Sequence, residues 1–270
     1  MVAIDRHGRP RGFGSRRHYC FSHRGYRQEA ARITRAVAGR YGQHPGVVAW
    51  QTDNEYGCHD TVLSFSEAAR QALGLDPAAQ VVALLPGSRA SEIRYLAQPF
   101  VQAARRLHEL QPRLQFVLPT HDLLRPSIEQ VLQASGMDGK VKVVMGRSHD
   151  VQAACDVALV ASGTATLETA LFKRPMVIAY KMQWLSWRMA NGKRLLPWVG
   201  LPNILCNESL VPEFLQEQVQ PEALAKAVLA WLDDRSAVQR LEQRFTALHQ
   251  ELRQDMPTLS THAIQKILGA

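Results

Sequence analysis

Short hydrophobic runs alternate with amphipathic segments from about Gln71 onward. Near-continuous apolar runs, typical of buried strands, occupy residues 81–85, 114–118, 141–145, 157–160 and 175–180. Between these runs apolar residues recur every three or four positions, which predicts helices. The alternation predicts an α/β fold: a doubly wound parallel sheet, covered by helices on both faces, with ligands bound at the carboxyl ends of its strands.

Helical periodicity continues through the last ~60 residues, a length comparable to several ordinary helices. Helices are predicted there at residues 221–232, 238–252 and 258–268. Earlier helices are expected at 123–134, at 151–155 and directly after Gly163.

The first 70 residues follow a different pattern. One amphipathic helix is predicted over 26–41, a turn over 43–46 and a short apolar strand over 47–50. This part contains 11 Arg, no Lys and 6 acidic residues, whereas Lys is common in the remainder. Such a change of residue usage predicts two pieces, at residues 1–70 and 71–270.

Composition narrows the class of protein. With 46% hydrophobic and 21% charged residues, the chain is typical of globular domains. A net charge of +8 suits a phosphate-bearing partner or an anionic membrane surface. No apolar run is long enough to span a bilayer, and residues 1–18 lack the apolar core of a secretory signal. The four cysteines form no C-x-x-C pair, so we expect a cytoplasmic location and no metal.

Two turns carry the candidate chemistry. Pro86-Gly87-Ser88-Arg89 joins a strand to a helix, and Glu92 falls in the first turn of that helix. Gly87 permits close backbone approach, Ser88 can cap the helix, and the Arg89 guanidinium suits phosphate. Neither this turn nor the next matches a dinucleotide or P-loop motif.

The second turn repeats this logic after the fourth strand. Ser162-Gly163-Thr164 offers hydroxyls and free amides at a helix amino terminus, so a diphosphate between the two turns is the predicted ligand. Glu168 would lie one turn into the helix, where it could accept hydrogen bonds from a ribose. The alternative is a plain helix cap with a solvated acid.

The amino-terminal piece resembles a TIM-barrel β-galactosidase. FGSRRHYCFSHRGYRQEAARI and HPGVVAWQTDNEYGCHD carry the likeness, over about residues 10–69. The resemblance implies that Glu55, beside Asn54, is a glycosidase acid/base. A retaining glycosidase needs a second carboxylate, which would lie on a later strand, and one αβ unit cannot close a barrel. We therefore expect an incomplete fragment that does not fold on its own.

The remainder, from about Ala69, resembles the carboxyl-terminal half of lipid-A-disaccharide synthase. LLPGSRASEI, VALVASGTATLETALFKRPMVIAYKM, LPNIL and PEFLQE occur in this order. The resemblance implies one Rossmann-like half of a GT-B glycosyltransferase. It further implies an enzyme that transfers 2,3-diacylglucosamine from UDP to 2,3-diacylglucosamine 1-phosphate, with inversion and without a metal or other cofactor.

The resemblance also assigns site residues. Arg89 and Asn203 are the expected catalytic residues. The donor-binding set it implies comprises Gly87, Ser88, Arg89, Glu92, Ser162, Gly163, Thr164, Thr166, Glu168, Glu213 and Gln216. The family's amino-terminal acceptor domain is expected to be missing, with the acid that activates the acceptor. A β-galactosidase fragment and a non-catalytic UDP-binding module are the alternatives.

Residues 181–198 contain three Trp and four cationic side chains. Such a segment can lie in the headgroup layer of a membrane, or it can pack on the sheet with its cations solvated. The first reading predicts peripheral attachment to the inner membrane. No nucleic-acid partner is expected, and a homodimer is left open.

Overall fold

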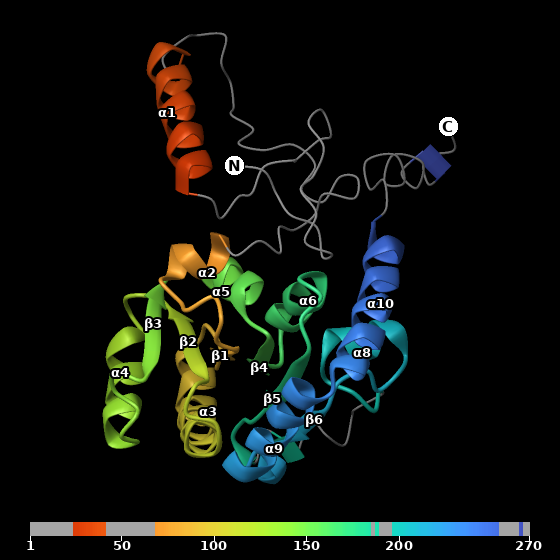
Figure 1. Ribbon diagram of the computed structural model, residues 1–270. Helices are drawn as coiled ribbons and strands as arrows, with labels where there is room; N and C mark the ends of the chain where they lie inside the picture. The colour runs from red at the N-terminus through yellow and green to blue at the C-terminus, as the bar shows by residue number, and fades with distance from the viewer. Residues whose placement is uncertain (1–23, 42–67, 185–186, 189–195, 254–264, 267–270) are drawn as a thin grey trace.

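The computed structural model describes residues 24–41, 68–184, 187–188, 196–253 and 265–266 (Figure 1). Glu55, Asn54 and the predicted strand 47–50 lie outside the described residues, as does nearly all of the predicted helix 258–268. Within the described residues, no helix is both long enough and apolar enough to cross a membrane.

A parallel sheet forms the centre of the molecule, in the order β3-β2-β1-β4-β5-β6. The order reverses between β1 and β4, so the carboxyl ends of these two strands form the topological switch point. The strands are β1 (Val81–Leu85), β2 (Gln115–Thr120), β3 (Val141–Met145), β4 (Val157–Ala161), β5 (Met176–Tyr180) and β6 (Glu213–Leu215). The predicted parallel, doubly wound sheet is confirmed.

Helices cover both faces of the sheet (Figure 1). One face carries α3 (Ala90–Leu110), α4 (Arg125–Ala134) and α9 (Pro221–Asp233). The other carries α2 (Ala68–Leu73), α5 (Ser148–Ala154), α6 (Thr164–Leu171), α8 (Leu201–Cys206) and α10 (Arg235–Leu252). A 3₁₀ turn, η1 (Gln216–Gln218), follows β6.

Alternate strand residues feed two separate cores. In β1, Val82 and Leu84 join the core under α3, whereas Val81, Ala83 and Leu85 join the opposite core. Successive strand side chains point to opposite faces, so a strand buried on both faces must be apolar at every position. This is why the strands could be read as continuous hydrophobic runs.

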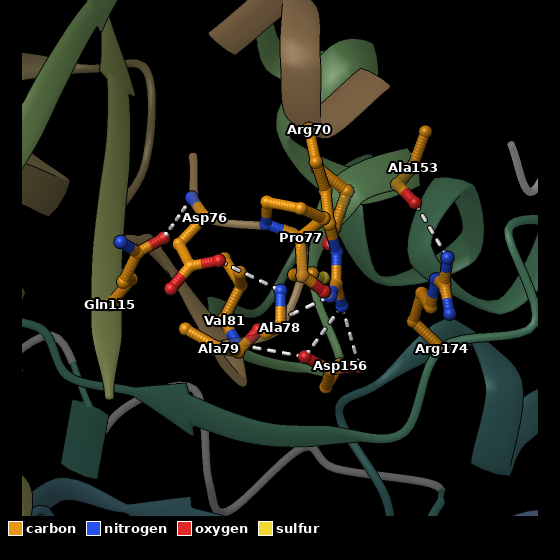
Figure 2. A network of polar contacts seen from close by, with 12 residues as sticks. Arg70, Asp76, Pro77, Ala78, Ala79, Val81, Gln115, Ala153, Asp156 and Arg174 are labelled. Carbon is orange, nitrogen blue, oxygen red and sulfur yellow. Dashed lines mark hydrogen bonds and ion pairs between the residues drawn. The ribbon is translucent and has the colours of Figure 1, made fainter. Parts of the chain in front are cut away.

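A polar network fixes α2 to the amino edge of the sheet (Figure 2). Arg70 Nη2 donates to both carboxylate oxygens of Asp156 at 2.8 Å, and Asp156 Oδ2 also accepts from Val81 N at 2.7 Å. The other Arg70 N–H groups donate to the carbonyls of Ala154, Pro77 and Ala79. The residues of α2, on both sides of the composition change at residue 70, are therefore built into the sheet domain.

The predicted helix in the first piece is present as α1 (Arg24–Tyr41). None of its residues is buried, and Ile33, Val37 and Tyr41 of its apolar face are exposed. An exposed ion pair joins it to the sheet domain: Arg27 Nη1 lies 3.3 Å from Asp150 Oδ2.

Candidate functional site

A cavity of about 450 Å³ lies at the switch point of the sheet. Its walls are the segments that follow the carboxyl ends of β1, β2, β3 and β4. The lining residues are Leu85, Gly87, Ser88, Arg89, Glu92, Pro119, Thr120, His121, Gly146, Ser148, Ala161, Ser162, Gly163, Thr164 and Ala165. Seven residues predicted from the two turns thus share one cavity, which is where open α/β sheets bind ligands.

Glu92 organises the first turn. Its Oε2 accepts from the amides of Ser88 at 2.8 Å and Arg89 at 3.1 Å, while its Oε1 accepts from Arg89 Nη1 at 3.0 Å. Gly87 has a φ of 118°, and a Cβ there would overlap the Glu92 side chain. In this structure Glu92 therefore occupies the amides of Ser88 and Arg89, two residues that the resemblance places at the diphosphate. Only the exposed Arg89 guanidinium still faces solvent as a charged donor.

In the second turn the Ser162 amide donates to the Ala179 carbonyl at 2.9 Å, whereas the next two residues, Gly163 and Thr164, are exposed. Gly163 has a φ of 157° and ψ of −163°, a backbone conformation that only glycine adopts readily. Gly163 and Thr164 are exposed to the cavity at the start of α6. Thr166 is different: it is fully buried, and its hydroxyl donates to the Gly163 carbonyl at 2.7 Å. Thr166 therefore braces the turn from behind and does not line the cavity.

Sequence reasoning missed the walls from β2 and β3. Thr120 ends β2, and its buried hydroxyl has no hydrogen-bond partner among the described residues. His121 Nε2 lies 3.2 Å from the Ser88 carbonyl, so it links this wall to the first turn. Ser148 begins α5. The signal that could have found them is their position, directly after predicted strands.

Glu168 lies one turn into α6, as predicted, but it faces α5. Its Oε2 accepts from Gln152 Nε2 at 3.1 Å and lies 3.6 Å from His149 Nε2. The hydrogen bond between Glu168 and His149 raises the pKa of the imidazole and lowers the pKa of the carboxyl. Glu168 does not line the cavity and here couples the two helices that border it.

Asn203 lies away from the cavity, wholly buried in α8. Its Nδ2 donates to the Val211 carbonyl at 2.9 Å and to Glu213 Oε1 at 2.8 Å. Its Oδ1 accepts from the amides of Leu210 and Val211. All its polar atoms are engaged within the fold, so in this structure the predicted catalytic residue is a bracing residue.

Glu213 connects Asn203 to the second turn. Its carboxylate accepts from Val199 N at 2.7 Å and Gly200 N at 3.0 Å. The Val199 carbonyl in turn accepts from Ser162 Oγ at 2.7 Å. The LPN and PEF motifs thus reach the cavity wall indirectly, through backbone groups of residues 199–200.

Gln216 likewise binds backbone groups, here at the beginning of the segment 181–198. It is buried, and its side-chain amide, oriented to suit both partners, pairs with the backbone of Met182: its nitrogen donates to Met182 O at 3.0 Å and its oxygen accepts from Met182 N at 3.3 Å. Glu213 and Gln216 therefore hold the two ends of the segment between β5 and α8.

The cavity suits an anionic ligand, although it offers that ligand few charged side chains. Arg89 is its exposed cation, the amino terminus of α6 borders it at Gly163 and Thr164, and Ser88 and Ser148 also line it. Among the described residues, no group of three or more His, Cys, Asp or Glu side chains could hold a metal ion. These features favour binding by hydrogen bonds and by one guanidinium.

Solved structures share this fold. A lipopolysaccharide glycosyltransferase, WaaG, aligns with a TM-score of 0.51 at 17% identity, over 76% of this chain and 51% of its own. A glycosyltransferase from Rickettsia africae aligns with a TM-score of 0.54 at 10% identity, over 75% and 51%. The fold and the place of the cavity define the class: a Rossmann-like domain, one half of the GT-B architecture.

Within that class the chain belongs to the lipid-A-disaccharide synthetase family, whose family model matches residues 60–267. The lipid-A-disaccharide synthase of Albidiferax ferrireducens is 55% identical over 205 residues, which cover 74% of this chain and 53% of the relative. The synthase of Bordetella pertussis is 42% identical over 262 residues, covering 90% and 61%. The chain spans roughly half to three fifths of the length of these relatives.

The amino-terminal resemblance is confirmed as well. A β-galactosidase family model matches residues 1–75. It overlaps the first match over residues 60–75, the region that contains α2. The chain therefore joins segments similar to two unrelated families.

Proposed function

We propose that the sheet domain binds a UDP-sugar, with the diphosphate in the cavity between the two turns. The observation that carries this proposal is the meeting of Gly87, Arg89, Gly163 and Thr164 at the switch point of a chain in this family. Arg89 would pair with the diphosphate, and the amides of α6 would donate to its oxygens. The uridine would lie toward the β2 and β3 walls.

For the whole reaction, we propose transfer of 2,3-diacylglucosamine from UDP to 2,3-diacylglucosamine 1-phosphate. The bond from the sugar anomeric carbon to the diphosphate oxygen breaks, the acceptor hydroxyl oxygen takes its place, and the hydroxyl proton would pass to a carboxylate of the family's amino-terminal acceptor domain. Negative charge accumulates on the departing UDP, and the Arg89 guanidinium beside it would stabilise that charge. Asn203 and Glu213 would act as positioning residues, since they hold Val199 and hence Ser162.

Ligand-induced stabilisation tests donor binding. UDP at 100 times its dissociation constant should raise the free energy of unfolding by about 2.7 kcal/mol, whereas galactose should not change it. Arg89→Gln should abolish most of this gain, and the exposed Arg113→Gln should retain it. Stabilisation by galactose and not by UDP would favour the β-galactosidase alternative.

A direct assay with both acylated substrates separates a transferase from a non-catalytic module. Formation of the disaccharide, lost in Arg89→Gln, supports the transferase. Confirmed UDP binding with no product supports the binding module instead.

We further propose that the segment after β5 contacts a membrane surface. Trp184 is 59% exposed and Arg188 lies over its ring, with Cζ 5.5 Å from the centroid. An exposed aromatic ring beside a cation suits the headgroup layer of anionic lipids. Trp184→Ala with Trp187→Ala should weaken sedimentation with anionic liposomes several-fold. Leu123→Ala, which removes an exposed apolar side chain elsewhere, should not.

A further inference from the structure

A second cavity, of about 600 Å³, adjoins the first. The two share Arg89, Glu92 and Ser162, so a single wall separates them. The first cavity extends from that wall over β2 and β3, whereas the second extends toward the end of β5. Its other lining residues are Ala90, Ser91, Arg94, Tyr95, Tyr180, Lys181, Met182 and Gln183.

Cationic side chains dominate the second cavity. Arg89, Arg94 and Lys181 line it, and Glu92 is the one acidic residue among the described residues that do so. Glu92 is already engaged with Arg89 and two amides. In the part of the chain that the structure describes, Arg94 and Lys181 form no ion pair; Arg94 lies over the Tyr95 ring, with Cζ 5.9 Å from the centroid.

Separate structural elements hold these two cations beside the same space. Arg94 follows Ala90 by four residues on α3, so both lie on one face of that helix. Lys181 comes directly after β5, and its neighbour Met182 is held by Gln216. Partly buried Tyr95 packs against the core beneath Arg94. A guanidinium fork and an ammonium group on supported backbone suit a doubly charged phosphate.

The charges of the proposed substrates assign a ligand to this cavity. If the UDP diphosphate occupies the first cavity, its acylated sugar brings no further charge to match Arg94 and Lys181. The acceptor sugar, in contrast, carries a phosphate monoester, with a charge near −2 at neutral pH. We propose that the second cavity binds this phosphate monoester, so that the donor half also holds the acceptor. This inference rests on the proposed function.

Phosphorus NMR can test both cavities in one sample of the full chain. UDP is added to saturation, glucosamine 1-phosphate is titrated, and the monoester and diphosphate signals are followed separately. Arg94→Gln with Lys181→Gln should weaken glucosamine 1-phosphate binding at least tenfold and change UDP affinity less than twofold. Bound near two cations, the monoester should also titrate below its free pKa of about 6.

The matched control removes the same charges from exposed positions elsewhere, in Arg113→Gln with Lys226→Gln. Unchanged affinity in the cavity variant, or an equal loss in the control, overturns the inference while UDP binding still supports the proposed function. Equal binding of glycerol 3-phosphate would assign the cavity to a lipid headgroup and overturn the acceptor assignment. If UDP shows no binding, the donor proposal fails, whatever the monoester does.

Discussion

At the scale of single residues, the side chains that line the cavity at the switch point differ from those that hold its backbone. Arg89 and Thr164 line the cavity, whereas Asn203 and Glu213 bond to each other and to backbone groups. A buried amide with every donor and acceptor paired is expensive to remove, because its partners are then left without hydrogen bonds. Changes at the two kinds of residue should therefore have different effects.

Asn203→Ala should lower the free energy of unfolding by about 1–3 kcal/mol, because it leaves the buried amide of Val211 and carbonyl of Val211 unpaired. UDP affinity of the folded variant should change only modestly. Urea unfolding and UDP titration measure the two effects. Ser209→Ala, an exposed change nearby, is the control. A stable variant that has lost UDP binding would return Asn203 to the ligand site.

The pKa values of two histidines should be shifted in opposite directions from the ordinary value of 6.5. Burial, followed by the charges of Lys173 and Arg253, lowers the pKa of His249 to about 4. The Glu168 hydrogen bond raises the pKa of His149. Proton NMR of the histidine rings in the folded protein measures both midpoints. A His249 midpoint near 6.5 would contradict the packing of α10.

The sign of the effect on stability follows from these shifts. Because folded His249 stays neutral, its contribution is complete above pH 6.5 and is lost as pH falls toward 4. His149 contributes below pH 6.5 and loses its contribution as pH rises past its raised pKa. The free energy of unfolding should therefore fall less in His249→Gln than in the unaltered protein when the experiment lowers the pH from about 7.5 to about 5. Urea unfolding of both proteins at the two pH values measures this difference.

At the scale of elements, the pattern of neighbouring residues predicted the strands and turns that depend on neighbouring residues alone. The continuous apolar strands and the two turns directly after β1 and β4 were visible because each depends on neighbouring residues. The short edge strand β6 was missed, since Glu213 and Phe214 are only half-buried there and lack a continuous apolar run. The roles of Gln216 and Glu213 depend on hydrogen bonds to distant backbone, which spacing does not reveal.

The helix α2 shows the same limit at the junction between the two pieces. The composition change predicted a boundary at residue 70, yet Arg70 makes a bidentate pair with Asp156 and also donates to three carbonyls. The pair is formed only when the sheet is assembled. We therefore propose that the boundary lies before Ala68, at the start of α2.

Arg70→Met should lower the free energy of unfolding by about 1–3 kcal/mol. The Asp156 carboxylate then loses its cation but keeps the Val81 amide, and its partial exposure limits the cost below that of a fully buried pair. Arg106→Met, which removes the exposed pair with Glu222, should leave stability unchanged. Equal urea midpoints for the Arg70 variant and the unaltered protein would show that α2 is not part of the domain.

At the scale of the whole molecule, the described walls of the cavity at the switch point come from one sheet domain. The described lining residues fall between Leu85 and Ala165, and the described part of the first piece touches this domain through exposed groups such as Arg27. The sheet and the two hydrophobic cores that cover it therefore fix the relative positions of these lining residues. None of the residues described in the segment similar to β-galactosidase, 24–41 and 68–75, lines this cavity.

Removing residues 1–67 should therefore leave UDP affinity within twofold, because the cavity and α2 both stay intact. Removing residues 1–74 takes away α2 as well, so that Asp156 loses Arg70, and unfolding should then occur at a lower temperature. Calorimetry of the three proteins, with and without UDP, measures affinity and stability together. A tenfold loss of UDP affinity in the shorter deletion would mean that the amino-terminal piece completes the site, and the two segments would then have to be regarded as one functional unit.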